Sequence, residues 1–232
     1  SRQNRAEQIF TDVYRKIELC AAVLVALMLE ICIIPRHLVV KPLVQYGQSI
    51  QRGEIFPVVG AAELQELALT YNEVYRENQE TQKLIRHEAE HDALTDALNR
   101  GSFEKILNIY EGGEKPFGMI ICDIDIFKQV NDLHGHTVGD LILRKVARLL
   151  TTTFRIDYVC RIGGDEFAVI MVDVGCELSH TVSDKIELIN DALSNPTDGL
   201  PAVSLSVGVA FTDRENPGES IFKDADQALY RV

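Results

Sequence analysis

Hydrophobic residues follow three different patterns along the chain. Near the N-terminus, the run LCAAVLVALMLEICII at 19–34 is apolar except for Glu30. The next segment has apolar residues three and four positions apart, which is typical of an amphipathic helix. From about Asp92 onward, runs of helical spacing alternate with short β-branched runs. These patterns predict long N-terminal helices followed by a domain of helices and strands.

The apolar run suggests a membrane-spanning helix. It covers about 24 Å as a helix, a little less than a bilayer core of roughly 30 Å, and Ile17 and Val39 extend it. Glu30 would cost a few kcal/mol at the bilayer centre and less near a helix end. We predict a transmembrane helix over 17–37 after a juxtamembrane segment at 1–16. The alternative is a buried helix of a soluble bundle.

Residues 38–91 are predicted to form a signalling linker. A helical pattern begins at Lys41, RGEIFPVVG interrupts it at 52–60, and a second helical pattern begins near Ala61. The apolar positions of this second helix form the seam of a coiled coil: Leu64, Leu67, Tyr71 and Val74. Two short helices joined by a connector after an apolar span resemble a HAMP module. An ordinary helical linker is the alternative.

The remaining residues, 92–232, predict an α/β (α+β) fold with a central mixed sheet and surrounding helices. We expect strands at 118–126 and 202–211 and a hairpin through Gly163 and Gly164. Helices are expected at 102–110, 138–152, 179–194 and 220–230.

Charge and cysteine content narrow the possible partners. The net charge of −12 argues against nucleic acid and against an anionic membrane surface as partners. The five cysteines form no CxxC pair: Cys20, Cys32, Cys122, Cys160 and Cys176. We predict buried free thiols in a reducing compartment, with disulfides or a zinc site as the alternatives.

Carboxylates stand at the ends of two predicted strands. In RIGGDEFAVI, at 161–170, the two glycines predict a turn with positive φ, followed by Asp165 and Glu166 at the mouth of an apolar strand. In MIICDIDIF, a period of two places Asp123 and Asp125 on one face. Buried carboxylates call for a cation, and hard oxygen ligands suit Mg²⁺. We expect Asp123 to hold the metal and Asp125 to pair with a nearby Lys or Arg.

The segment FKQVNDLHGHTVGD at 127–140 supplies polar groups suited to a nucleotide. Lys128 offers charge for phosphate, Asn131 offers hydrogen bonds, and Gly135 and Gly139 predict a loop. Asp140 is expected to open an amphipathic helix. Its carboxylate either complements the helix dipole or accepts from the N1–H and N2–H donors of guanine.

Five segments together resemble the GGDEF family of diguanylate cyclases. They are DALTDALNR at 92–100, DIDIFKQVND at 123–132, GHTVGD at 135–140, GGDEF at 163–167 and LSVGVA at 205–210. The resemblance covers 92–232 and implies a fold like the palm of nucleotide cyclases. It implies that two GTP molecules react, each 3′-hydroxyl attacking the other's α-phosphate, to give cyclic di-GMP and two pyrophosphates. Each domain would hold half a site, so the active form would be a homodimer.

The resemblance also implies roles for individual residues. Mg²⁺ (or Mn²⁺) would be held by Asp123, the backbone carbonyl of Ile124 and Asp165. The catalytic residues would be Asp165 and Glu166, which deprotonate the 3′-hydroxyl, and Lys128. The substrate-binding residues would be Asn131 and Asp140 at the guanine with His136 beside them, and Phe127 and Lys128 at the phosphates.

Two departures from the family pattern are visible. Product-inhibited members carry Arg-x-x-Asp before the GGDEF pair, whereas here Asp157 is present, Phe154 takes the Arg position and Arg155 follows it. A degenerate inhibitory site with weak or absent feedback is therefore predicted. The chain ends at ADQALYRV, before a Lys and a Gly-Arg-Asn segment that the family carries, which predicts a C-terminally truncated domain.

The resemblance places the protein in the bacterial inner (cytoplasmic) membrane, with the 92–232 domain in the cytoplasm and cyclic di-GMP receptors downstream. Two other functions are alternatives. A degenerate domain would bind GTP or cyclic di-GMP and signal without catalysis. A scaffold would use the coiled coil only for dimerisation, which leaves the metal-binding acids unexplained.

Overall fold

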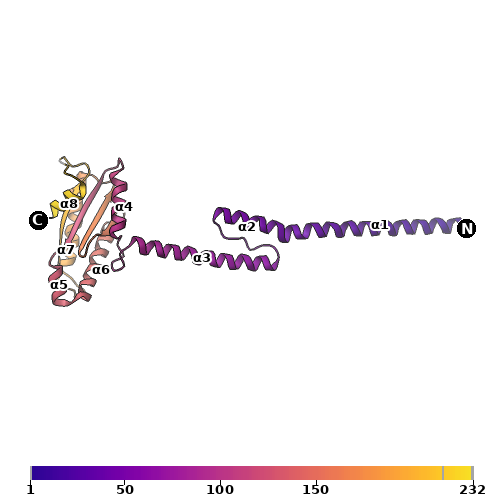
Figure 1. The fold of residues 1–232 in the computed structure, drawn as a ribbon, viewed down its shortest axis with the longest axis horizontal. Coiled ribbons are helices and arrows are strands. Elements are labelled where there is room, and N and C mark those ends of the chain that lie inside the picture. The colour runs from indigo at the N-terminus through magenta and orange to yellow at the C-terminus, as the bar shows by residue number, and fades with distance from the viewer. Residues whose placement is uncertain (1, 216, 231–232) are drawn as a thin grey trace. The chain divides into compact units, whose positions relative to one another are not determined.

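The computed structural model describes residues 2–215 and 217–230, with side chains from Val13 onward. The chain divides into two compact units, 1–83 and 84–232 (Figure 1). Each unit is described separately below.

The first unit begins with a long, nearly continuous helical stretch. It consists of helix α1 (Arg2–Pro35), the π-helical turn η1 (Arg36–Val40) and helix α2 (Lys41–Arg52). Pro35 has no N–H and its ring crowds the preceding turn, which explains why the widened turn follows it. Between Val13 and Arg52 the helix contains a window of mean hydropathy 2.6 with no buried residue. By length and composition alone, this helix is able to cross a membrane.

Helix α2 and helix α3 (Ala62–Glu90) run in the same direction, joined by a connector that returns along α2. The Ala61 N–H donates to the carbonyl of Leu38 at 2.9 Å, which brings the start of α3 beside the start of α2. Gly60 has φ of 97°, and a Cβ there would lie 2.7 Å from the Leu38 carbonyl oxygen. A glycine is therefore required at this close crossing.

Buried contacts fix the connector against both helices. The Phe56 ring stacks between Tyr46 and Tyr71, with centroid distances of 4.5 and 3.7 Å. The buried Asn72 amide accepts from the Phe56 N–H at 2.6 Å and donates to its carbonyl at 2.8 Å. Asn72 thus satisfies both backbone groups of a residue that lies outside regular structure.

The predicted coiled-coil seam of α3 is divided between two environments. Leu64 and Tyr71 pack inside the first unit, against the cluster around Phe56. Leu67 and Val74 are exposed to solvent in the single chain. Two of the four seam residues therefore stabilise the first unit itself, and the other two remain exposed.

The second unit is a four-stranded sheet with helices on both faces. Its helices are α4 (Arg100–Glu111), α5 (Phe127–His134), α6 (His136–Thr153), α7 (Ser179–Ser194) and α8 (Ile221–Leu229), with a 3-10 turn η2 (Cys176–Leu178). Its strands are β1 (Phe117–Ile124), β2 (Tyr158–Arg161), β3 (Glu166–Val172) and β4 (Leu205–Phe211), in the order β2-β3-β1-β4.

The predicted α+β class is confirmed, with one refinement of the sheet. All pairs of neighbouring strands are antiparallel. Within the described residues, parallel pairing is confined to an isolated bridge between Leu98 and Cys160. The four-stranded sheet itself is therefore antiparallel, and not mixed as expected.

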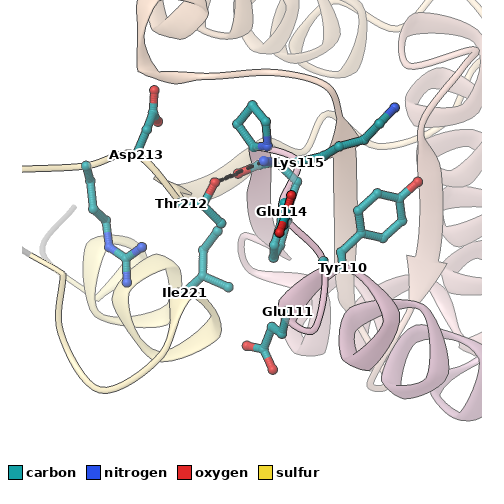
Figure 2. Close-up of a pocket in the computed structure, with 11 residues that line it drawn as sticks. Tyr110, Glu111, Glu114, Lys115, Thr212, Asp213 and Ile221 are labelled. Atoms are coloured by element: carbon teal, nitrogen blue, oxygen red, sulfur yellow. Dashed lines mark hydrogen bonds between the residues drawn. The ribbon is translucent and has the colours of Figure 1, made fainter.

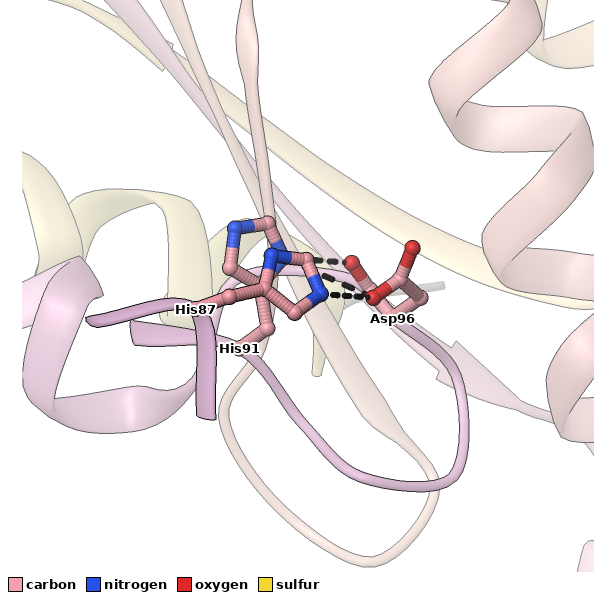
Figure 3. A group of neighbouring side chains, drawn as sticks. All are labelled: His87, His91 and Asp96. Atoms are coloured by element: carbon pink, nitrogen blue, oxygen red, sulfur yellow. Dashed lines mark hydrogen bonds and ion pairs between the residues drawn. The ribbon is translucent and has the colours of Figure 1, made fainter. Parts of the chain in front are cut away.

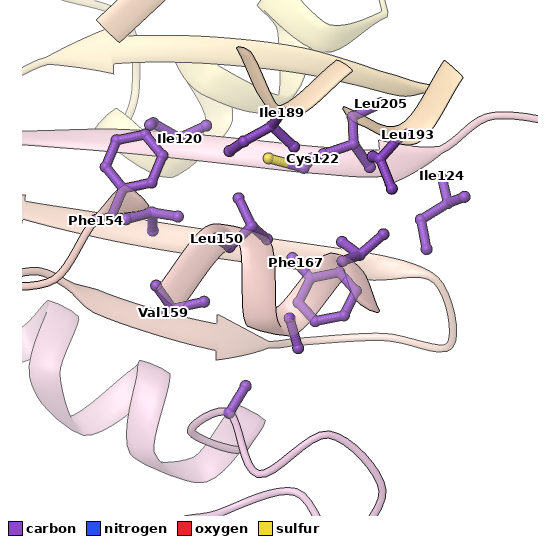
Figure 4. Packing of buried hydrophobic residues seen from close by; sticks show 14 of the residues in the cluster. Ile120, Cys122, Ile124, Leu150, Phe154, Val159, Phe167, Ile189, Leu193 and Leu205 are labelled. Atoms are coloured by element: carbon purple, nitrogen blue, oxygen red, sulfur yellow. The ribbon is translucent and has the colours of Figure 1, made fainter. Parts of the chain in front are cut away.

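Alternating residues of the central strand β1 enter two hydrophobic cores. One core contains Ile120, Cys122 and Ile124, together with side chains of α6 and α7 such as Leu150 and Ile189 (Figure 4). The other contains the intervening residues of β1, with side chains of α4 and α8: Phe117, Met119, Ile121, Phe103, Ile221 and Ala225. Because β1 is buried on both faces, charge within it is confined to the strand's end.

The cysteine prediction is only partly right. All five thiols are free, and Cys122 and Cys160 are buried, so that burial raises the pKa of each to about 12. The other three, Cys20, Cys32 and Cys176, are exposed. Among the described residues, nothing covers the apolar run that contains Cys20 and Cys32, which explains the exposure of these two.

A partly buried ion pair attaches the segment after α3 to the sheet. Arg161 Nη1 lies 2.9 Å from Asp92 Oδ1, and the two side chains are 14% and 26% exposed. The Thr95 N–H and hydroxyl donate to the same oxygen at 3.0 and 2.7 Å. Although burial raises the pKa of Asp92, the hydrogen bonds from Thr95 and Arg161 outweigh it and lower the pKa.

We predict that Asp92→Asn lowers the free energy of unfolding at neutral pH by about 1–3 kcal/mol, because Arg161 loses its charged partner. A carboxyl with a lowered folded pKa stabilises above its unfolded pKa of about 3.9, and this contribution disappears as the pH falls through the folded pKa. The difference in the free energy of unfolding between variant and parent, measured by urea unfolding, should therefore become smaller at acid pH.

The matched control is Glu104→Gln, which removes an exposed ion pair with Arg100 on α4. Its expected cost is below about 0.5 kcal/mol. Equal costs for the two variants would contradict the role assigned to Asp92.

Candidate functional site

Four acidic residues lie at one end of the sheet, around the last residues of β1. In the strand register, Asp123 is opposite Glu166 of β3 on one side and Ser206 of β4 on the other. Asp165 directly precedes β3, and Asp125 directly follows β1. The central position of β1 therefore gathers acids from two segments that are far apart in the sequence.

The turn that carries Asp165 is a hairpin between β2 and β3, as expected. The N–H groups of Ile162 and Gly163 donate to the Glu166 carbonyl at 3.0 and 3.3 Å. The expected positive φ is wrong, since neither Gly163 nor Gly164 has one. Gly163 instead leaves room for the Glu166 carboxylate, which a Cβ there would displace.

The electrostatics of this end of the sheet favour a cation. The pKa of Asp123 is raised, first by burial and then by the negative charges of Asp165, Glu166 and Asp125. Ionised Asp123 is therefore unfavourable unless positive charge is supplied. Hard carboxylate and carbonyl oxygens are the donors that Mg²⁺ and similar divalent cations prefer, so the donor set fits such an ion.

The predicted metal ligands are two carboxylates and one backbone carbonyl. Asp123 and Asp165 are half-buried, and Ile124 is buried at the end of β1. Among the described side chains, the acids of this cluster do not place three ligand atoms within 4.8 Å of one another. A cation bound here would thus need further ligands besides the two carboxylates, such as the Ile124 carbonyl and oxygens of a bound ligand.

Asp125 has a different role from the one expected. The Ser206 hydroxyl donates to its carboxylate at 2.6 Å and the Ser204 hydroxyl donates as well, while the Asp125 N–H donates to the Ser204 carbonyl at 3.0 Å. The expected ion pair with a Lys or Arg is replaced by these serine contacts. Asp125 therefore ties the end of β1 to the start of β4.

The chain then turns sharply into a helix that the sequence pattern did not predict. Ile126 has φ of 55°, a left-handed conformation that is uncommon for a β-branched residue. Helix α5 follows at once and carries Phe127, Lys128 and Asn131. Backbone strain of this kind, of order 1–3 kcal/mol, is often found at functional sites.

Helices α5 and α6 pack closely because of one buried glycine. A Cβ on Gly139 would overlap the Asn131 side-chain oxygen and would lie 3.2 Å from Phe127 Cζ. The loop expected at Gly135 and Gly139 is therefore wrong for Gly139, which lies within α6. Only Gly135, with φ of 80°, separates the two helices.

The structure places the predicted guanine and phosphate residues on these two helices. Lys128 and His136 are exposed, whereas Asn131 and Asp140 are partly buried. Asp140 does not open its helix but lies one turn into α6, next to Gly139. Along the chain, the end of β1 with Asp123 and Asp125, helix α5 and the first turns of α6 thus follow one another closely.

The residues of the predicted inhibitory motif lie in different environments. Phe154, at the arginine position, is buried in the core, and Lys185 Nζ lies 4.8 Å from the centroid of its ring. Arg155 is exposed. Asp157 accepts from the Val172 N–H at 3.2 Å; burial raises its pKa, partly opposed by this bond and by Lys185. Asp157 is therefore engaged in holding β3.

Arg161 is a connecting residue that the sequence analysis missed. Its Nη1 contacts Asp92, and its Nη2 donates to the Gly164 carbonyl at 2.7 Å. One side chain thus joins the segment after α3 to the turn that carries Asp165. An arginine two positions before a glycine pair was the available sequence signal.

A well-formed hollow of about 470 Å³ lies at the opposite end of the sheet (Figure 2). It is formed where β1 begins and β4 ends, and its lining includes Tyr110, Lys115, Thr212 and Asp213. It contains none of the predicted site residues. Its shape alone does not make it the functional site, because the clustered charges lie at the other end.

Comparisons with known proteins show which family the second unit resembles. The sequence model described as the diguanylate cyclase GGDEF domain matches residues 89–232. The diguanylate cyclase DgcM of Escherichia coli (strain K12) is 32% identical over 168 residues, covering 67% of this chain and 39% of that protein. The probable diguanylate cyclase DgcT of the same strain is 33% identical over 158 residues, covering 65% and 35%. The chain therefore spans less than half the length of either relative.

A solved structure has the same fold. The coiled coil and GGDEF domain of DgcB from Caulobacter crescentus, in complex with c-di-GMP, superimposes with a TM-score of 0.59 at 30% identity. The match covers 71% of this chain and 91% of that one.

We predict that Asp123→Asn raises the thermal unfolding midpoint in EDTA at neutral pH, by the order of 2 °C. A raised carboxyl pKa means that ionised Asp123 destabilises the fold, and this penalty vanishes below the unfolded pKa of about 3.9. The same variant should lose stabilisation by Mg²⁺. Differential scanning calorimetry at several pH values, with and without the cation, measures both effects.

The control is Asp184→Asn on the exposed surface of α7, which should change neither quantity. A variant Asp123→Asn that is less stable in EDTA, or that responds to Mg²⁺ as the parent does, would contradict the electrostatic account.

Proposed function

Since the chain belongs to the GGDEF family of diguanylate cyclases, we propose that it condenses two GTP molecules into cyclic di-GMP and two pyrophosphates. The observation that carries the proposal is the acid cluster at the end of β1, where burial and then the neighbouring carboxylates raise the pKa of Asp123. Such a cluster suits a divalent cation together with a triphosphate.

The residues of the chain bind and orient the nucleotide in this proposal. Asp123, Asp165 and the Ile124 carbonyl hold the cation, proposed to be Mg²⁺ (or Mn²⁺), which supplies positive charge at the triphosphate when bound. Asn131 and Asp140, with His136 beside them, bind the guanine edge. Phe127 and Lys128, at the start of α5, lie against the phosphates.

The reaction needs one proton acceptor for each new bond. Each 3′-hydroxyl oxygen forms a bond to the α-phosphorus of the other GTP, and the bond from that phosphorus to the pyrophosphate oxygen breaks. The hydroxyl proton goes to Asp165 or Glu166, which lie at the mouth of β3. Two such steps close the ring and release two pyrophosphates.

We also propose that two copies of the chain are required, each contributing one GTP site. The exposed Leu67 and Val74 of α3 provide apolar surface for a parallel coiled coil between copies. Residues 38–91 would act as a HAMP-like linker between the membrane segment and the domain at 92–232. No nucleic acid is expected to bind, given the net charge of −12.

The proposed location is the bacterial inner membrane. The predicted span at 17–37, preceded by the segment at 1–16, lies within the apolar helix Val13–Arg52. The cyclase domain would lie in the cytoplasm, where GTP is available, and cyclic di-GMP receptors would act downstream.

The test of the activity is an assay of the chain with GTP and Mg²⁺. Cyclic di-GMP should form, and Asp165→Ala should reduce the rate more than about 100-fold, because one of the cation's ligands is removed. The control variant Asp184→Ala should keep the parent rate. Binding of GTP without turnover by the parent would favour the degenerate receptor instead.

Product inhibition through the Arg155 and Asp157 motif is predicted to be weak or absent. The arginine position is occupied by the buried Phe154, and Asp157 holds the backbone of Val172. The dependence of the cyclase rate on added cyclic di-GMP should therefore be the same for Arg155→Ala and the parent. Tight cyclic di-GMP binding that persists in Asp165→Ala and is lost in Arg155→Ala would contradict this.

A further inference from the structure

His87 lies in the last turn of α3, and His91 directly follows the helix on the same side. His87 and His91 are one turn apart, and the His91 N–H donates to the His87 carbonyl at 2.9 Å, so the helical geometry continues through both. Their rings stack with centroids 4.0 Å apart and an angle of 22° between the planes (Figure 3). The two imidazoles are therefore held side by side by the backbone.

Asp96 lies against both rings. Its Oδ1 is 2.7 Å from His87 Nε2 and 3.9 Å from His91 Nδ1, and its backbone carbonyl is 2.7 Å from the same His91 nitrogen. Asp96 reaches this position through a left-handed backbone conformation, with φ of 60°. The three possible ligand atoms all lie within 4.8 Å of one another.

The geometry points to a binding site for a borderline transition-metal cation, of which Zn²⁺ is the representative, formed by His87, His91 and Asp96. Two imidazoles and a carboxylate are donors typical of such cations and are less suited to Mg²⁺. The site is separate from the acids at the end of β1. The inference does not depend on the proposed cyclase activity.

Binding the cation requires His91 Nδ1 to give up its contact with the Asp96 backbone carbonyl and requires the ligand distances to change. Tetrahedral coordination with metal–ligand bonds of about 2.0–2.1 Å places neighbouring ligand atoms about 3.3 Å apart. The His87–Asp96 distance of 2.7 Å must lengthen and the His91–Asp96 distance of 3.9 Å must shorten. The exposed side chains of His87 and Asp96 have room to make these adjustments.

The site is accessible, which leaves a coordination position for water. The side chains of His87, His91 and Asp96 are 51%, 28% and 78% exposed. The neighbouring Asp92 carboxylate is already held by Arg161 and Thr95, and so it does not compete for the cation.

The backbone that carries the ligands is fixed by other contacts. Asn99 Nδ2 donates to the Ala89 carbonyl at 2.8 Å, and the Ser102 hydroxyl donates to the Glu90 carbonyl at 2.8 Å. The Asp96 N–H donates to the Asp92 carbonyl at 2.9 Å. Preorganised ligands lower the entropic cost of binding. The cation would tie the end of α3 to the turn at 92–99.

The test is a Zn²⁺ titration of the full chain in mild detergent, without a polyhistidine tag and with excess Mg²⁺ present. A chromophoric chelator reports the affinity by competition. All proteins carry Cys176→Ser, because Cys176, Glu177 and Asp213 form a second group of possible ligands. One Zn²⁺ per chain is expected, with an affinity at least about tenfold lower in His87→Ala and in Asp96→Asn.

Asp96→Asn is informative because asparagine tolerates the left-handed conformation, so the fold is retained while the charge is removed. His180→Ala, on the exposed surface of α7, is the matched control and should bind as the parent does. Co²⁺ in place of Zn²⁺ should give a visible absorption spectrum of tetrahedral type that is lost in His87→Ala. Equal Zn²⁺ affinity in the parent and in a His87→Ala, His91→Ala double variant would overturn the proposal.

Discussion

The repulsion between carboxylates at the end of β1 is the constraint on which the account depends. Asp123 is paired across the strands with Glu166 and lies close to the negative charges of Asp165 and Asp125. It stands near the end of a central strand whose other residues are apolar. Burial and like charge act in the same direction, and both raise the pKa of Asp123. An arrangement of this kind lowers stability unless positive charge is bound, which makes it informative about function.

The surrounding structure holds these acids in place through contacts of different kinds. Antiparallel pairing on both sides of β1 fixes Asp123, and Ser204 and Ser206, just before and within β4, fix Asp125. Glu166 lies close over Gly163 and Asn131 lies close over Gly139, and a Cβ at either glycine would require these side chains to move. The guanidinium of Arg161 then connects the acid-bearing turn to Asp92, just after α3. A shift at the end of α3 thus has a direct physical route to the turn.

Much of this was predictable from the sequence, and the failures have physical causes. Helix α7 has the predicted bounds, Ser179–Ser194, and the hairpin at Gly163 lies where expected, because apolar periodicity and glycines are local signals. Helix α5 was missed because Phe127–His134 is short and only Gly135 separates it from α6. The partners of Asp125 were missed because Ser204 and Ser206 meet it through strand pairing, which a single sequence does not reveal. The metal-binding role of Asp123 and Asp165 stays a prediction.

The most direct measurement is a crystal structure of the full chain, grown with Mn²⁺ and a GTP analogue that cannot release pyrophosphate. Anomalous scattering at the manganese edge then locates the cation in the domain at 84–232. The account predicts an anomalous peak between the carboxylates of Asp123 and Asp165, in contact with the triphosphate. A bound nucleotide whose manganese lies elsewhere, with those two carboxylates turned away from it, would contradict the account.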